Sequence, residues 1–78
     1  MRQIGVIVPV FNEELSIHSF FSEFLIFKKS LQEKGYEAVV LFVDDGSKDL
    51  TPKILKDLSE QNLCCKSIVL SRNFGKEA

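Results

Sequence analysis

The sequence predicts an α/β domain with a parallel sheet in the order β-α-β-α-β. Three apolar runs are typical of strands, at about 3–10, 37–43 and 66–70, and segments with helical spacing separate them. Strands that alternate with helices form parallel sheets with right-handed crossovers, so all three should end at one edge. We expect the strand order 3-2-1, because the first crossovers of a doubly wound α/β sheet wind outward from the first strand.

The first strand is almost continuously apolar, which is typical of a strand covered on both faces. Pro9 is near its end, where a missing N–H is tolerated. Asn12 is the predicted N-cap of a long helix over 13–33, in which Glu13 would favour the positive end of the helix dipole. Gly35 follows the last turn and should end this helix.

Phenylalanine is concentrated in this first helix, with four of these residues between positions 20 and 27. Apolar residues at spacings of three and four form one stripe on a helix. We interpret the stripe as the side that covers the sheet, in preference to a membrane or partner surface.

The second strand is also predicted to be buried on both faces, and it runs directly into Asp44-Asp45-Gly46-Ser47. Thr51 and Pro52 are the predicted N-cap and first residue of a second helix that ends near Asn62. The third strand leads into Ser71-Arg72-Asn73.

Length and composition limit the function classes. With 78 residues the chain is at most one small domain, and we expect it to be the N-terminal part of a larger protein. The net charge of −1 offers no basic surplus for a nucleic-acid backbone. Neither a signal peptide nor an apolar run of the ~20 residues that span a bilayer is present, so we expect a cytoplasmic segment. Cys64 and Cys65 are adjacent, which fits two reduced thiols better than a disulfide or a zinc site.

Polar residues follow each strand, and the parallel topology would gather them at one edge of the sheet. Phe11 could stack on a flat ring, Asp44 and Asp45 could accept hydrogen bonds from a base or ribose, and Arg72 could pair with phosphate. This combination suits a nucleotide at the carboxyl ends of the strands. Taken singly, the phenylalanine could be core, the acidic pair could be turn chemistry and the arginine could be surface. No G-x-G-x-x-G and no NTPase phosphate loop accompanies them.

The segments Ile7-Val8-Pro9-Val10-Phe11-Asn12-Glu13-Glu14 and Val43-Asp44-Asp45-Gly46-Ser47-Lys48-Asp49-Leu50-Thr51 resemble the opening of family 2 glycosyltransferases, which have the GT-A fold. The third segment, Leu70-Ser71-Arg72-Asn73-Phe74-Gly75-Lys76-Glu77, is similar to the polyisoprenyl-phosphate subgroup, which includes dolichol-phosphate mannosyltransferases and bactoprenol glucosyltransferases. The resemblance implies that residues 1–78 are the incomplete N-terminal half of a Rossmann-like nucleotide-sugar-binding domain.

The resemblance also implies a function. The whole protein would move a hexose from a nucleotide sugar, preferably a UDP-sugar, to a polyisoprenyl phosphate with inversion, at the cytoplasmic face of a membrane. In such enzymes Phe11 is at the usual aromatic position beside the donor base, and Asp45 hydrogen-bonds the base. The resemblance assigns six residues to this nucleotide subsite: Pro9, Phe11, Glu13, Asp44, Asp45 and Arg72.

The family's metal-binding D-x-D, which would hold Mg²⁺ or Mn²⁺, and its catalytic base would come after Ala78. We therefore expect no catalytic residue and no metal ligand within this chain, and any membrane contact would come from other regions. Two alternatives remain: a receiver-type signalling module, which would need its acidic pair after the first strand, and a non-catalytic α/β binding fragment.

Overall fold

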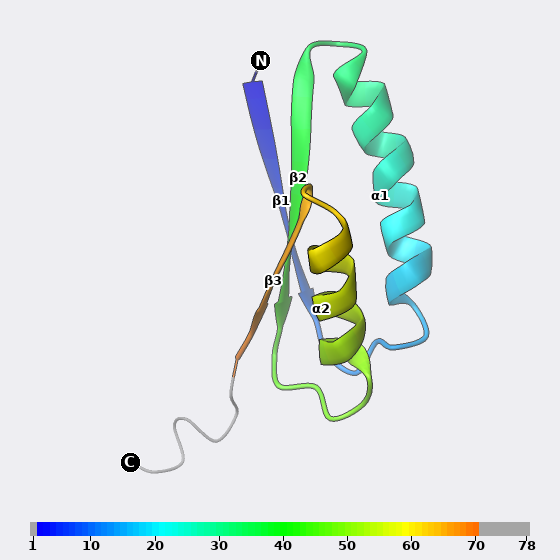
Figure 1. Ribbon diagram of the computed structural model, residues 1–78, viewed down its shortest axis with the longest axis vertical. Helices are drawn as coiled ribbons and strands as arrows, with labels where there is room; N and C mark the ends of the chain where they lie inside the picture. Colours follow the sequence, from blue (N-terminus) through cyan, green and yellow to red (C-terminus); the bar gives the residue numbers. More distant parts are fainter. Residues whose placement is uncertain (1, 71–78) are drawn as a thin grey trace.

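Five elements follow one another in the computed structural model, which describes residues 2–70 (Figure 1). They are β1 (Arg2–Val10), α1 (Ile17–Gln32), β2 (Tyr36–Asp44), α2 (Thr51–Gln61) and β3 (Cys65–Val69). The predicted β-α-β-α-β order is confirmed. Each strand boundary lies within one residue of its prediction, whereas the first helix begins later than predicted.

The three strands form one parallel sheet in the order β1-β2-β3, which is the predicted 3-2-1 order. In the register, Val6 is opposite Val40, and Val40 is opposite Cys65. The three strand arrows point the same way in Figure 1. All three carboxyl ends therefore lie at the same edge of the sheet, as expected for right-handed crossovers.

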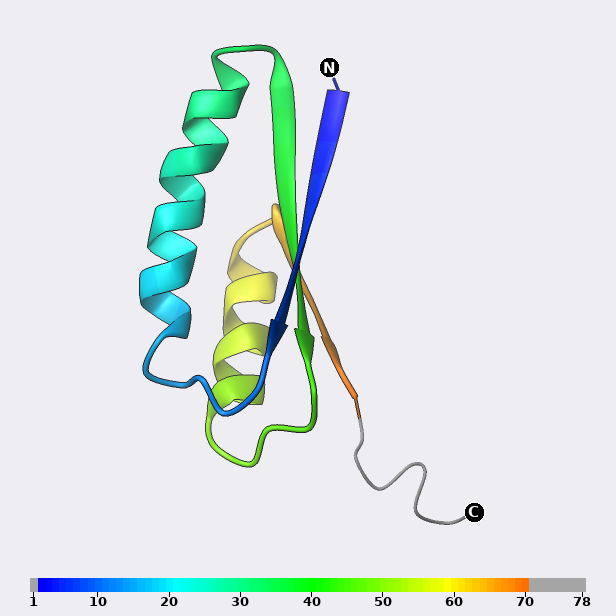
Figure 2. The ribbon, with the colours of Figure 1, turned by 180° about the vertical axis from the view of Figure 1, so that it is seen from behind.

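Both helices lie on the same side of the sheet, and neither Figure 1 nor Figure 2 shows a helix of residues 2–70 on its other side. The prediction that the first two strands are covered on both faces is therefore wrong for residues 2–70. Ile7 and Ile68, on the uncovered face, are 69% and 48% exposed. The physical reason is that both crossovers step in the same direction across the sheet, so their common handedness puts both helices on one side.

The core lies between the helices and the covered face of the sheet. Its residues alternate along the strands and recur at helical spacing in the helices, as the two periods require. The buried apolar residues are Val10, Ile17, Phe21, Phe24, Ala38, Val40, Phe42, Leu55, Leu58 and Cys65.

The phenylalanines of α1 divide between this core and the surface. Phe21 and Phe24 are buried, whereas Phe20 and Phe27 are 40% and 47% exposed. Phe20 still contacts the core through an edge-to-face contact with Phe42, at 5.7 Å between ring centroids. The prediction that α1 covers a sheet face is confirmed, and part of its apolar stripe extends beyond that face.

The start of α1 differs from the prediction. Asn12 has a φ of 51°, a left-handed conformation that Asn tolerates better than most residues, and the helix begins at Ile17. The carbonyl of Glu13 accepts hydrogen bonds from the N–H groups of Ser16 and Ile17. Asn12 does not cap α1, because its polar groups bond the loop after β2. Gly35, with a φ of 88°, ends the segment as predicted.

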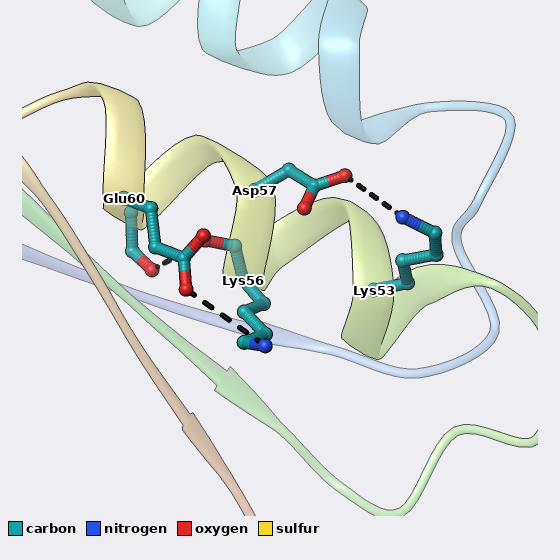
Figure 3. Close-up of polar contacts among 5 residues, drawn as sticks. Lys53, Lys56, Asp57 and Glu60 are labelled. Atoms are coloured by element: carbon teal, nitrogen blue, oxygen red, sulfur yellow. Dashed lines mark hydrogen bonds and ion pairs between the residues drawn. The ribbon is translucent and has the colours of Figure 1, made fainter.

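Helix α2 begins one residue before the prediction, with Thr51 inside the helix and Pro52 in the first turn. Asp49 partly performs the capping role, because its Oδ1 accepts a hydrogen bond from the Thr51 N–H at 2.8 Å. On the outer surface of α2, Lys53 pairs with Asp57 and Lys56 with Glu60, as Figure 3 shows.

Pro9 lies inside β1, where it faces the unpaired side of the strand. The carbonyl of Val10 accepts a hydrogen bond from the Asp45 N–H, so Val10 bonds toward β2. Adjacent residues of a strand direct their backbone groups to opposite sides, so the missing N–H of Pro9 belongs to the other side. No strand pairs with that side among residues 2–70. The sheet ladder therefore loses no hydrogen bond at Pro9.

Among residues 2–70 we find no helix of the length and apolar character that crossing a membrane requires. Cys64 and Cys65 are both free thiols, as the sequence predicts.

Candidate functional site

The carboxyl ends of β1 and β2 bring Phe11 and Asp45 close together. The N–H of Asp45 donates a hydrogen bond of 3.0 Å to the carbonyl of Val10, the residue immediately before Phe11. Phe11 is 42% exposed, and Asp45 is also exposed. An exposed aromatic residue and an exposed acidic residue thus have neighbouring backbones, at the sheet edge where α/β proteins bind nucleotides.

The two adjacent aspartates have different environments. Asp44 is the last residue of β2 and is fully buried, whereas Asp45 lies beyond the strand and is exposed. Oδ1 of Asp44 accepts hydrogen bonds from the Ser47 N–H at 2.9 Å and from the Ser47 hydroxyl at 2.6 Å. Oδ2 of Asp44 is buried without a hydrogen-bond partner among residues 2–70. Asp44 and Asp45 were predicted to act in one site, but solvent reaches only Asp45, because Asp44 faces the core at the end of β2.

Gly46 makes the tight turn between these groups possible. Its φ of 81° lies in the left-handed region, which costs glycine little because it has no Cβ. The turn brings Ser47 back over Asp44 and leaves Asp45 at the outer edge of the loop.

Side chains of each loop bond the backbone of the other. The Asn12 N–H donates to Ser47 Oγ at 2.7 Å, and Asn12 Oδ1 accepts from the Lys48 N–H at 2.9 Å. One position further along, the Glu13 N–H donates to Thr51 Oγ1 at 2.9 Å. The β1–α1 and β2–α2 loops are thus connected side chain to backbone, in both directions.

A second group of bonds lies closer to the start of α2. The Glu14 N–H donates to Asp49 Oδ2 at 3.2 Å, and Glu14 Oε1 accepts from the Leu50 N–H at 2.8 Å. Burial would raise the pKa of Asp49, but hydrogen bonds from Thr51 and from backbone N–H groups outweigh it and lower that pKa. Asp49 therefore stays ionised and serves the loop structure.

Pro9 and Glu13 lie beside a small apolar cavity between β1 and the start of α1. The cavity has a volume of about 110 Å³, and Phe20 and Phe42 also line it. Glu13 is exposed, so its carboxylate remains accessible from the solvent. Arg72, the sixth residue assigned to the subsite, lies outside the described residues.

The described acidic residues do not fit a metal centre. Within residues 2–70, no three His, Cys, Asp or Glu side chains gather in a group that could hold an ion. Asp44 is turned into the core and already accepts two hydrogen bonds from Ser47, while Asp45 lies outside the sheet. The D-x-D metal site was predicted to follow Ala78, so that prediction lies outside the described residues.

The roles of Asn12 and Ser47 in joining the two loops were not predicted from the sequence. An Asn directly after a strand, at a position compatible with positive φ, was the available signal for the first. The position of Ser47 in the turn after a strand-end Asp was the signal for the second, because Asp side chains accept hydrogen bonds within turns. Asn12 and Ser47 both belong to the motifs that resemble family 2 glycosyltransferases. Their partners in the opposite loop lie more than thirty residues away, and strand pairing brings them together.

Comparison with known proteins found a matching family and similar relatives. The family described as Glycosyl transferase family 2 matches residues 5–78. Over 75 residues the chain is 39% identical to the "Prophage bactoprenol glucosyl transferase homolog" of Escherichia coli (strain K12) and to the "Bactoprenol glucosyl transferase" of Shigella phage SfX. It is also 39% identical to the glycosyltransferase YkcC of Bacillus subtilis (strain 168).

The chain belongs to glycosyl transferase family 2, because that family matches nearly its whole length. This membership excludes the alternative that the chain is a receiver-type signalling module. Each alignment covers 96% of this chain but only 22–24% of the relative, so the chain spans about a quarter of the length of these proteins.

Proposed function

We propose that this chain forms part of the donor-nucleotide subsite of a glycosyltransferase that transfers a hexose from a UDP-sugar to a polyisoprenyl phosphate, with inversion. Family membership supports the reaction class. The names of the bactoprenol glucosyl transferases support the acceptor, because bactoprenol is a polyisoprenol. The full-length protein would work at the cytoplasmic face of a membrane.

One observation carries the assignment of the subsite. The hydrogen bond from the Asp45 N–H to the Val10 carbonyl holds the backbone at Asp45 next to the residue before Phe11, at the carboxyl end of a parallel sheet, and both Asp45 and Phe11 are exposed. A ring of this kind can stack on a base, and a carboxylate can accept the imide N–H of uracil. Pro9 and Glu13, which line the neighbouring cavity, would border the base.

Asp44, which the sequence analysis also placed in this subsite, has its carboxylate inside the protein. We therefore assign base recognition to Asp45. The Mg²⁺ or Mn²⁺ expected in such enzymes would be held by residues outside 2–70, since Asp44 and Asp45 do not fit a metal.

The test is a calorimetric titration of UDP into the full-length protein and its Asp45→Ala variant. We expect Asp45→Ala to weaken binding by about 1.5–3 kcal/mol, the usual range for a hydrogen bond to a charged group. The effect should raise KM for the donor and leave kcat nearly unchanged, because the base lies away from the reacting centre.

Asp57→Ala is the matched control, because Asp57 is an exposed carboxylate on the outer surface of α2 (Figure 3). Equal affinity of the wild type and Asp45→Ala would remove Asp45 from the site. The 78-residue chain by itself, assayed with UDP-glucose, GDP-mannose and a short polyprenyl phosphate, should show no transfer. Turnover by the purified 78-residue chain would contradict the assignment of catalytic groups to other parts of the protein.

A further inference from the structure

We propose that Asp44 and Ser47 are positioning residues, which act with Asn12 to hold Phe11 and Asp45 at the spacing that a nucleotide needs. This role rests on the proposed function for its consequence in binding. We refer to Asp44, Ser47 and Asn12 together as the brace.

Asp44 is the fixed end of the brace. It is opposite Val10 of β1 and Val69 of β3 in the sheet register, and its carbonyl accepts a 2.8 Å hydrogen bond from the Leu70 N–H. Its side chain has no exposed surface. The middle strand of the sheet therefore holds this carboxylate rigidly, and a ligand at the surface cannot touch it.

Ser47 connects the fixed carboxylate of Asp44 to the β1–α1 loop. A hydroxyl can accept one hydrogen bond while it donates another. Ser47 Oγ accepts from the Asn12 N–H at 2.7 Å and donates to Asp44 Oδ1 at 2.6 Å. Asn12 Oδ1 then accepts from the Lys48 N–H, which completes a closed set of bonds between the loops.

The brace is adjacent to both proposed binding residues. Phe11 directly precedes Asn12, and Asp45 directly follows Asp44. The φ of 51° at Asn12 is one of several conformations that Asn can adopt, and the hydrogen bonds of the brace select it. Without the brace, the Phe11 ring would sample more positions, and binding would include the cost of ordering it again.

The two oxygens of Asp44 allow this role to be separated from direct ligand contact. Oδ1 accepts both bonds from Ser47, whereas Oδ2 has no hydrogen-bond partner among residues 2–70. The brace therefore uses one acceptor atom and not the negative charge. An Asp44→Asn variant keeps that acceptor as its amide oxygen, and Asp44→Ala removes it. A carboxylate that bound a ligand through its charge would lose its function in both variants.

The experiment measures the Kd for UDP and donor kinetics of the full-length protein. We expect Ser47→Ala and Asp44→Ala to raise the Kd about tenfold, with kcat at saturating donor within about twofold of wild type. Asp44→Asn and Ser47→Thr, which keep the acceptor and the hydroxyl, should stay within about threefold. Ile54→Val in α2 is the control for a modest loss of core packing, and it should leave the Kd unchanged.

Two outcomes would overturn the positioning role: an Asp44→Asn variant as weak as Asp44→Ala, or a Ser47→Ala variant with the wild-type Kd. Hydrogen exchange of a peptide that contains Asn12 provides a measurement without ligand. Exchange should accelerate at least about fivefold in Ser47→Ala and Asp44→Ala, but not in Asp44→Asn or Ile54→Val.

This second measurement separates the two proposals. A wild-type protein that binds no UDP would contradict the proposed function, and the exchange data would still decide whether the brace orders the loop. Unchanged exchange at Asn12 in Ser47→Ala would overturn the brace, even in a protein that binds UDP.

Discussion

The two faces of the sheet are built from alternate residues of the same strands, but only one face is covered. On the covered face Val40 and Phe42 have no exposed surface, whereas on the other face Ile7 is 69% exposed. Both faces are apolar, so composition does not distinguish them. The difference shows that a run of apolar residues indicates which face can be buried, and that the path of the chain decides which face is buried.

Two adjacent cysteines show the same alternation at single-residue scale. Cys65 begins β3 and is buried at 1% exposure, while Cys64 directly before it is only partly buried. Asp44 and Asp45 differ in the same way. In each pair one side chain is buried, and its neighbour is more exposed to solvent.

The largest expected effect is at Phe42 in the covered face. Phe42→Ala should cost about 3–5 kcal/mol, because it opens a cavity where no neighbouring side chain can move in fully. A loss of this size is a large part of the stability of a small domain. Urea unfolding of the chain, followed by circular dichroism, measures the change.

Ile7→Ala on the uncovered face is the matched comparison, and in the 78-residue chain it should change stability by less than about 0.5 kcal/mol. The same substitution can be made in the full-length protein. If Ile7→Ala lowers the stability of that protein by well over about 0.5 kcal/mol, another segment covers this face of the sheet. Equal costs for Phe42→Ala and Ile7→Ala in the 78-residue chain would contradict the difference between the faces.

The next effect concerns the pH dependence of Cys65. Burial, with a smaller contribution from the charge of Cys64, raises the pKa of the Cys65 thiol from 9.0 to about 11. The folded state favours the protonated thiol, so its contribution to stability is fully present below pH 9. This contribution is lost as the pH rises through the folded-state pKa of about 11. The loss should be about 2–3 kcal/mol.

The unfolding free energy between pH 8 and 11, compared with that of Cys65→Ala, isolates this loss, since the two proteins differ only in the Cys65 thiol. The alanine variant should show a shallower decline. Iodoacetamide should also modify Cys64 before Cys65 in the folded chain. A parallel decline in both proteins would mean that the thiol remains solvated.

The smallest effects concern ion pairs. Lys53 and Asp57 on the outer surface of α2 are 71% and 51% exposed, so Lys53→Ala should change stability by less than about 0.5 kcal/mol (Figure 3). Lys28 and Glu37 are 15% and 33% exposed, and the hydrogen bond from Lys28, helped by one from Gln32, lowers the pKa of Glu37. Glu37→Gln should therefore cost more than Lys53→Ala.

The sign of the pH effect follows from this lowered pKa. The contribution of Glu37 is present above the ordinary value of 4.5 and is lost as the pH falls through the lower folded-state pKa. Acid titration of wild type and Glu37→Gln, followed by circular dichroism, checks it. A steeper acid transition in wild type is expected, and identical transitions would show that the pair contributes nothing measurable.

Much of the fold could be predicted because its signals are local. Apolar runs identified the three strands to within one residue, Gly35 marked the end of α1, and alternation of strand and helix led to a parallel sheet. The start of α1 was predicted wrongly for the same reason. Asn12 has the local properties of an N-cap, but a stronger use of its polar groups lies in a loop more than thirty residues away.

The sequence by itself predicted the parallel pairing and the edge at which Phe11 and Asp45 meet, because crossovers between alternating strands and helices bring the carboxyl ends of the strands to one edge. The strand order was predicted from the outward winding of doubly wound sheets. Only the tertiary structure decided that Asp44 faces the core and that Ser47 joins it to Asn12. It also decided which face of the sheet the helices cover. The physical reason is that hydrogen bonding and burial at these positions depend on which strands and loops become neighbours, and spacing along the chain does not contain that information.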